Sequence, residues 1–137
     1  MQRGRLNEYF HSDEFVCKCG CGIFNLDDDF FAKLTEARRE ADVPFVINSG
    51  CRCPTWNKKQ GGTRLSGHIT TEVIKARASD IRATTVYVMI RIMRGALLAD
   101  MPGIALGHGF VHLDTKHRKM IKAYAAFTLT GRGFSLG

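Results

Sequence analysis

Three residues of the chain have the types and the setting of a metal site. His68 follows Ser-Gly in "RLSGH", Asp80 comes twelve residues later in "ARASDI", and His112 lies further on in "GFVHLD". A catalytic zinc ion takes three protein ligands of this kind and leaves its fourth position to water or substrate. Zinc lowers the pKa of that water to roughly 7, which makes a hydroxide nucleophile. Residue types and spacing alone favour ordinary hydrogen-bonded histidines, and the metal site stays open here as the second interpretation.

The strand pattern around His112 predicts which side chains accompany it. Residues 103–115 are typical of two strands joined at the turn 107–109. Because side chains alternate between the two faces of a strand, His112 should share one face with Phe110 and Asp114. Further strands are predicted at 43–50, at 78–82 (which carries Asp80) and at 123–130, where a loose tail is the alternative.

Two long helices and one helical turn complete the predicted elements. Residues 25–42 form the clearest helix, with Asn25 as its cap, and a second helix runs from Thr84 or Thr85 to Leu98. A helical turn begins at Pro54 and ends before Gly61 and Gly62. The buried face of the first helix is predicted as Phe30, Phe31, Leu34 and Ala37 or Ala41, and that of the second as Val86, Met89, Ile90, Met93 and Leu97. These elements predict an α+β domain with an antiparallel sheet packed against helices.

Composition and charge exclude several classes of protein. The 137 residues are 45% hydrophobic and 24% charged, which is typical of one folded domain. No apolar run is long enough for a membrane span, and the N-terminal residues lack the apolar region of a secretory signal. The net charge of +7, densest over 115–122, favours an anionic partner such as nucleic acid or cell wall, although a solvated basic face explains it as well. Nucleic acid is disfavoured because the sequence lacks a helix-turn-helix, zinc-finger or aromatic-platform signature.

The five cysteines lie in two tight clusters. Cys17, Cys19 and Cys21 belong to "CKCGCG", and Cys51 and Cys53 belong to "CRC". The odd number argues against a simple disulfide framework. Neither cluster has the Cys-x2-Cys spacing of a zinc ribbon. Small buried thiols are therefore favoured over a structural zinc site.

Four stretches of the chain together resemble the M15 family of zinc D-Ala-D-Ala carboxypeptidases and murein endopeptidases, and especially its small phage and bacterial branch. They are "FHSDEFVCKCGCG", "FVINSGCRCPTWNKKQGGTRLSGH", "ARASDI" and "GFVHLDT", which occur in the family's order and approximate spacing. The resemblance covers about residues 10–118. It implies a single Hedgehog/DD-peptidase-like domain over 1–137, with a basic C-terminal tail after the core.

The resemblance also implies roles for particular residues. His68, Asp80 and His112 fall on the family's ligands for Zn²⁺. Arg52 falls on the arginine of the substrate cleft, where a guanidinium can hold a peptide carboxylate or polarise the scissile carbonyl.

The chain departs from the family pattern at two places. The family reads S-x-H-x-x-G-x-A-x-D, so the interval between His68 and Asp80 is longer here. The additional residues can loop out at small cost or move His68 away, and Glu72 within them is an alternative ligand. The family also places an acid or a histidine shortly before its third ligand as general base. The candidates here are His108 in the turn and Asp114, which we interpret mainly as a partner of the metal ligands.

The function expected from this resemblance is zinc-dependent hydrolysis of peptide bonds in peptidoglycan stem peptides. The sequence does not separate a carboxypeptidase from an endopeptidase. Small size, basic charge and the missing signal suit a monomeric phage-type lysis enzyme, or endolysin, that accumulates in the cytoplasm and acts on the anionic cell wall after release. A non-catalytic module that binds cell wall or a protein on the same fold is the alternative.

Overall fold

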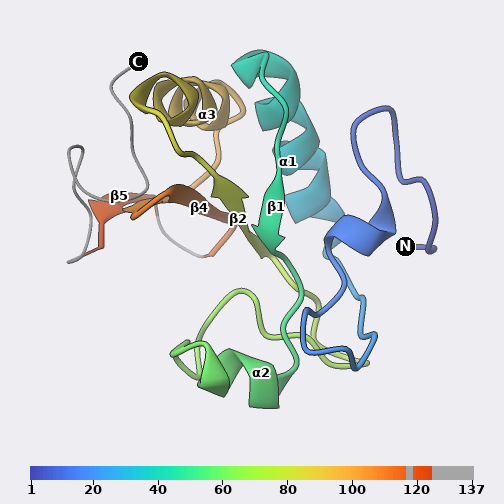
Figure 1. The fold of residues 1–137 in the computed structure, drawn as a ribbon. Coiled ribbons are helices and arrows are strands. Elements are labelled where there is room, and N and C mark those ends of the chain that lie inside the picture. Colours follow the sequence, from blue (N-terminus) through green and yellow to red (C-terminus); the bar gives the residue numbers. More distant parts are fainter. Residues whose placement is uncertain (117–118, 125–137) are drawn as a thin grey trace.

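The computed structural model describes residues 1–116 and 119–124, which form an α+β domain (Figure 1). Five short strands make one sheet, and two long helices pack beside each other against it. The strands are β1 (Ile47–Ser49), β2 (Ala78–Arg82), β3 (Gly103–Gly107), β4 (Phe110–Asp114) and β5 (Met120–Ala123). The helices are α1 (Asp28–Ala41), α2 (Pro54–Lys59) and α3 (Val86–Leu98), with a short 3₁₀ helix at Ser12–Glu14. None of the described helices is long and apolar enough to cross a membrane.

The sheet is mixed, although the prediction of antiparallel pairing holds for four of its strands. The strand order is β1-β2-β4-β3-β5, and only β5 runs parallel to its neighbour β3. The end of β4 and the start of β5 both lie opposite Gly103, so β5 begins at the end of β3 where β4 finishes and runs antiparallel to β4. The strand predicted at 123–130 lies mostly outside the described residues, as does most of the predicted basic tail.

The two faces of the sheet differ in chemistry. On one face, Ile81, Val111 and Leu106 lie side by side across β2, β4 and β3 and join the hydrophobic core with α1 and α3. Because side chains alternate along a strand, the opposite face carries Asp80 and His112, which are directly paired. The sheet therefore separates the core from the candidate site.

Helix α1 has the predicted buried face but a different cap. Its buried residues are Phe30, Phe31, Leu34, Ala37 and Ala41. The cap is Asp27, whose carboxylate accepts a hydrogen bond from Phe30 N, and the prediction of Asn25 is wrong. The Asn25 amide instead donates to the carbonyl oxygens of Thr71 and Glu72, so it fastens the segment before the helix to a distant loop.

Helix α3 is capped by Thr85, as predicted, but its buried face is rotated. Ile92 and Ala96 are fully buried beside Met89, whereas the predicted core residues Ile90 and Leu97 are 56% and 54% exposed. The cause is Gly95, where an added Cβ would lie 2.2 Å from the carbonyl oxygen of Ala37 in α1. Contact between the two helix backbones at this glycine fixes which face of α3 is inside.

Candidate functional site

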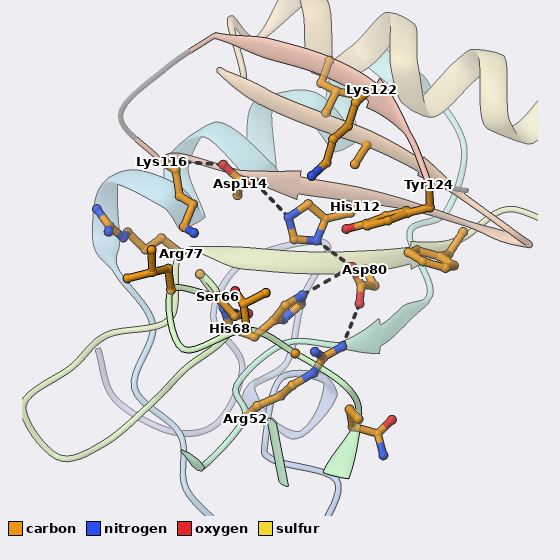
Figure 2. A pocket seen from close by; sticks show the side chains of 18 of the residues that line it. Arg52, Ser66, His68, Arg77, Asp80, His112, Asp114, Lys116, Lys122 and Tyr124 are labelled. Carbon is orange, nitrogen blue, oxygen red and sulfur yellow. Dashed lines mark hydrogen bonds and ion pairs between the residues drawn. The ribbon is translucent and has the colours of Figure 1, made fainter. Parts of the chain in front are cut away.

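Asp80 and His112 meet because β2 and β4 pair in register. The two residues are directly opposite each other, and His112 Nδ1 lies 2.8 Å from Asp80 Oδ1. On the other side of His112 the paired residue is Ala105, whose small side chain leaves room above the sheet. Figure 2 shows both side chains projecting from the sheet into one pocket.

His68 joins this pair from the long segment between α2 and β2. Its backbone oxygen accepts a hydrogen bond from Arg52 N at 2.8 Å, which ties the segment to the chain after β1. Its Nε2 lies 3.3 Å from Asp80 Oδ1 (Figure 2). One possible ligand atom from each of His68, Asp80 and His112 lies within 4.8 Å of the others.

The additional residues between His68 and Asp80 loop away from this cluster. The base of the loop is closed by a hydrogen bond from Arg77 N to Gly67 O at 2.9 Å. At its tip, the Thr71 hydroxyl oxygen accepts hydrogen bonds from Val73 N and Ile74 N, and Val73 is 87% exposed. Glu72 belongs to this exposed turn and is not part of the ligand cluster of the described residues.

The hydrogen bonds of the two histidines fit a metal ion. A carbonyl oxygen can only accept, so the 2.8 Å contact between His68 Nδ1 and Gly50 O places the proton on Nδ1. The buried Nε2 of His68 is then a lone-pair nitrogen, and it has no hydrogen-bond partner among the described residues. His112 Nε2 donates to Asp114 Oδ2 at 2.8 Å. The other ring nitrogen, Nδ1, is therefore the one that faces Asp80. A carbonyl or carboxylate behind each imidazole is the usual support of a histidine ligand.

The electrostatics of the cluster favour a positive charge on His112, which lies between the carboxylates of Asp80 and Asp114. Burial alone would raise the pKa of Asp80, but the two nearby imidazoles outweigh it and hold this pKa well below its usual range. Burial likewise opposes charge on His112, yet hydrogen bonds with Asp114 and Asp80 raise its pKa to about 9. Burial also acts to raise the pKa of Asp114, and the hydrogen bond from His112 overcomes it, so that pKa is lowered.

Arg52 lies at the edge of the cluster, in the chain that follows β1. Its Nη2 donates to Asp80 Oδ2 at 3.0 Å, and its Nε donates to Ser49 Oγ at 2.8 Å. The guanidinium therefore holds the Asp80 oxygen that does not contact the histidines. This contact with the predicted ligand was not expected from the sequence.

The two predicted acid–base residues lie in different settings. Asp114 has both oxygens engaged, because Oδ1 also accepts a hydrogen bond from Lys116 N at 2.9 Å. His108 lies in the turn between β3 and β4 and is not among the described residues that line the pocket.

The cluster lies in a pocket of about 690 Å³ whose wall is strongly basic. Besides Arg52, its lining includes Arg77, Lys116, Lys122 and Tyr124 (Figure 2). Sequence reasoning did not single out these four residues. The dense positive charge over 115–122 was a sequence signal for the two lysines, whereas no sequence pattern indicated Tyr124. The ring centre of Tyr124 lies 6.5 Å from that of His112.

A two-histidine, one-carboxylate cluster in an open pocket defines a candidate metal-dependent hydrolase. Comparison with protein families gives the class: residues 8–114 match the family described as Peptidase M15. The match spans most of the chain, so the protein belongs to the peptidase M15 family of metal-dependent peptidases. No curated protein matches the chain at a significant level.

Proposed function

We propose that the protein is a zinc peptidase that hydrolyses peptide bonds in peptidoglycan stem peptides. The observation that carries the proposal is the pair of histidines, each fixed by a second hydrogen bond so that its other nitrogen faces Asp80. Two imidazoles and one carboxylate are a ligand set that zinc uses in peptidases. A zinc ion held by His68, Asp80 and His112 would supply an activated water and polarise the scissile carbonyl.

The protein groups around this cluster have separate tasks. Arg52 keeps Asp80 oriented and presents positive charge at the pocket wall, where it can stabilise the developing oxyanion or hold a carboxylate. Burial raises the pKa of Tyr124, so its phenol stays protonated and can donate a hydrogen bond to the same oxygen. Asp114 positions His112. We retain His108 as a candidate acid–base residue but assign it no step, since it does not line the pocket.

The basic wall supports a substrate with free carboxylates. Arg77, Lys116 and Lys122 surround the cluster, and no described acidic residue lines the pocket other than Asp80 and Asp114. Stem peptides offer carboxylates at the D-Ala end and on their acidic residues. A carboxypeptidase would use one of these cations to hold the terminal carboxylate, and an endopeptidase would use them for side-chain carboxylates. We propose that the enzyme acts as a monomer on the anionic wall after cytoplasmic accumulation, as in phage lysis.

The first experiment measures metal and activity together. Zinc per chain is determined for the unsubstituted protein and for His68→Ala and His112→Ala, each checked for folding by circular dichroism. We expect each variant to lose one zinc ion and all release of D-Ala, or of cross-linked fragments, from purified stem peptides. Equal zinc in all three proteins would refute the site. Zinc loss without any cleavage by the unsubstituted protein, together with binding to cell wall, would favour the non-catalytic module.

A further inference from the structure

Four of the five cysteines meet at a second place in the fold, which shares no residue with the histidine cluster. Cys17, Cys19 and Cys21 come from the loop after the 3₁₀ helix, and Cys53 is the N-cap of α2. Their Sγ atoms all lie within 4.8 Å of one another. The distance is 3.4 Å from Cys17 to Cys19 and 3.7 Å from Cys19 to Cys53.

These distances fit a metal better than a disulfide. A disulfide needs sulfur atoms about 2.05 Å apart, and all five cysteines are free thiols. A tetrahedral ion with Zn–S bonds of about 2.3 Å holds its sulfur atoms about 3.8 Å apart. The two shortest contacts of the cluster, 3.4 Å and 3.7 Å, lie near this value, and all four sulfur atoms lie within 4.8 Å of one another. Four thiols that converge from two distant segments have the composition of a closed structural zinc site.

The backbone around the sulfur atoms supports the same interpretation. Gly20 and Gly22 adopt φ angles of +93° and +80°, which let the short loop turn three successive odd-numbered side chains toward one point. Backbone N–H groups donate to three of the sulfur atoms: Cys53 N to Cys17 at 3.4 Å, Cys21 N to Cys19 at 3.3 Å and Trp56 N to Cys53 at 3.4 Å. Such donors stabilise thiolates, the form in which cysteine binds metal.

The fifth cysteine explains the odd count. Cys51 is buried in the hydrophobic core, and its sulfur accepts a hydrogen bond from Asn25 N rather than joining the cluster. Cys19 and Cys21 are exposed, so the prediction of buried thiols is wrong for them. Their exposure leaves two thiols at the surface that a zinc ion would protect from oxidation.

We propose that Cys17, Cys19, Cys21 and Cys53 bind a second zinc ion in a closed, structural site. This inference does not depend on the proposed peptidase function. The ion would cross-link the N-terminal segment to the residue directly after Arg52. The same chain is held by hydrogen bonds from Cys51 N to Phe15 O and from Arg52 N to His68 O, both at 2.8 Å. The site therefore fixes the backbone that presents Arg52 to Asp80.

The test separates the two metal sites by variants. Protein purified under reducing conditions with zinc is compared with His68→Ala, with the double variant Cys19→Ser/Cys21→Ser and with the control Cys51→Ala. We expect two zinc ions per chain in the unsubstituted protein and in Cys51→Ala, and one in each of the other proteins. After replacement by Co²⁺, the sulfur-to-cobalt charge-transfer band should be present in His68→Ala and absent in the cysteine double variant.

Two results would overturn the proposal. One is an unchanged zinc content in the cysteine double variant. The other is absence of the charge-transfer band from cobalt-loaded His68→Ala, a measurement that does not require the cysteine variant to fold. Disulfides in place of the zinc, detected by mass spectrometry of the unreduced protein as a loss of two hydrogen atoms per bond, would overturn the proposal as well. Failure of the peptidase assay with the cysteine zinc present would leave this site standing and refute only the proposed activity.

Discussion

At the scale of single residues, the group behind each histidine decides which nitrogen can bind metal. Asp114 performs this task for His112 through a 2.8 Å hydrogen bond from Nε2. In Asp114→Asn the charge is lost, and the amide can present a donor where His112 needs an acceptor. We expect zinc affinity at the histidine site to fall by roughly 10- to 100-fold, the usual effect of removing such a support.

Competition with a chromogenic chelator measures this loss. Asp100→Asn is the matched control, because Asp100 is exposed and pairs only with Lys119 among the described ion pairs. It changes the net charge equally and should leave zinc affinity unaltered. Equal affinities in the two variants would show that Asp114 does not support His112.

Arg52 gives the second prediction at this scale. Its planar guanidinium contacts Asp80 and Ser49 at once, which the single ammonium of Arg52→Lys cannot reproduce. We expect kcat/KM to fall by about 10²-fold, as for the loss of one oxyanion donor, while zinc stays bound. Arg64→Lys, at an exposed arginine of the loop before His68, is the control. Full activity of Arg52→Lys would mean that Arg52 contributes only its positive charge and that its contact geometry is not required.

At the scale of elements, the contact between α1 and α3 depends on one glycine. In Gly95→Ala the new Cβ would lie 2.2 Å from Ala37 O, a backbone atom that cannot move without the helix. Alanine favours an isolated helix by up to about 1 kcal/mol, but overpacking typically costs about 1–3 kcal/mol. We therefore expect a net loss of stability in urea unfolding. Leu98→Ala, at an exposed position of the same helix, should change it little.

The elements also show how far the sequence could be interpreted. Side-chain alternation placed His112 and Asp114 on one face, because the period of a strand is fixed by its geometry. The face of α3 could not be found this way, since Ile90 and Met89 are both apolar and the close contact at Gly95 decides which of them is buried. The direction of β5 follows from its parallel pairing with β3, which no local pattern encodes.

The cysteines show the same limit for the site. The three histidine-cluster residues were found because their order resembles a family pattern, whereas Cys17 and Cys53 come together only when the fold brings distant segments into contact. Spacing rules for zinc ribbons apply to ligands within one turn. They do not report a site whose fourth ligand, Cys53, follows the nearest of the other three, Cys21, by 32 residues.

At the scale of the whole molecule, the net charge of +7 would serve the proposed function in two separable ways. Long-range attraction to an anionic wall depends on total charge and is screened within about 8 Å at physiological salt. Recognition of a substrate carboxylate depends on the cations inside the pocket. Lys122 lines the pocket, whereas Lys119 is exposed nearby and does not. Lys122→Glu and Lys119→Glu lower the net charge by the same amount, so they distinguish the two effects.

We expect both charge reversals to weaken sedimentation with purified cell wall to the same degree, and added salt to remove the difference from the unsubstituted protein. Only Lys122→Glu should raise KM for a short stem peptide, because it places a carboxylate where the substrate brings its own. Loss of a direct ion pair at a partly exposed pocket costs up to about 1 kcal/mol, which is about fivefold in affinity. The repulsion that the reversal introduces adds to this, so KM should rise by roughly tenfold. An equal rise of KM in Lys119→Glu would mean that total charge, and not the pocket, draws the substrate in.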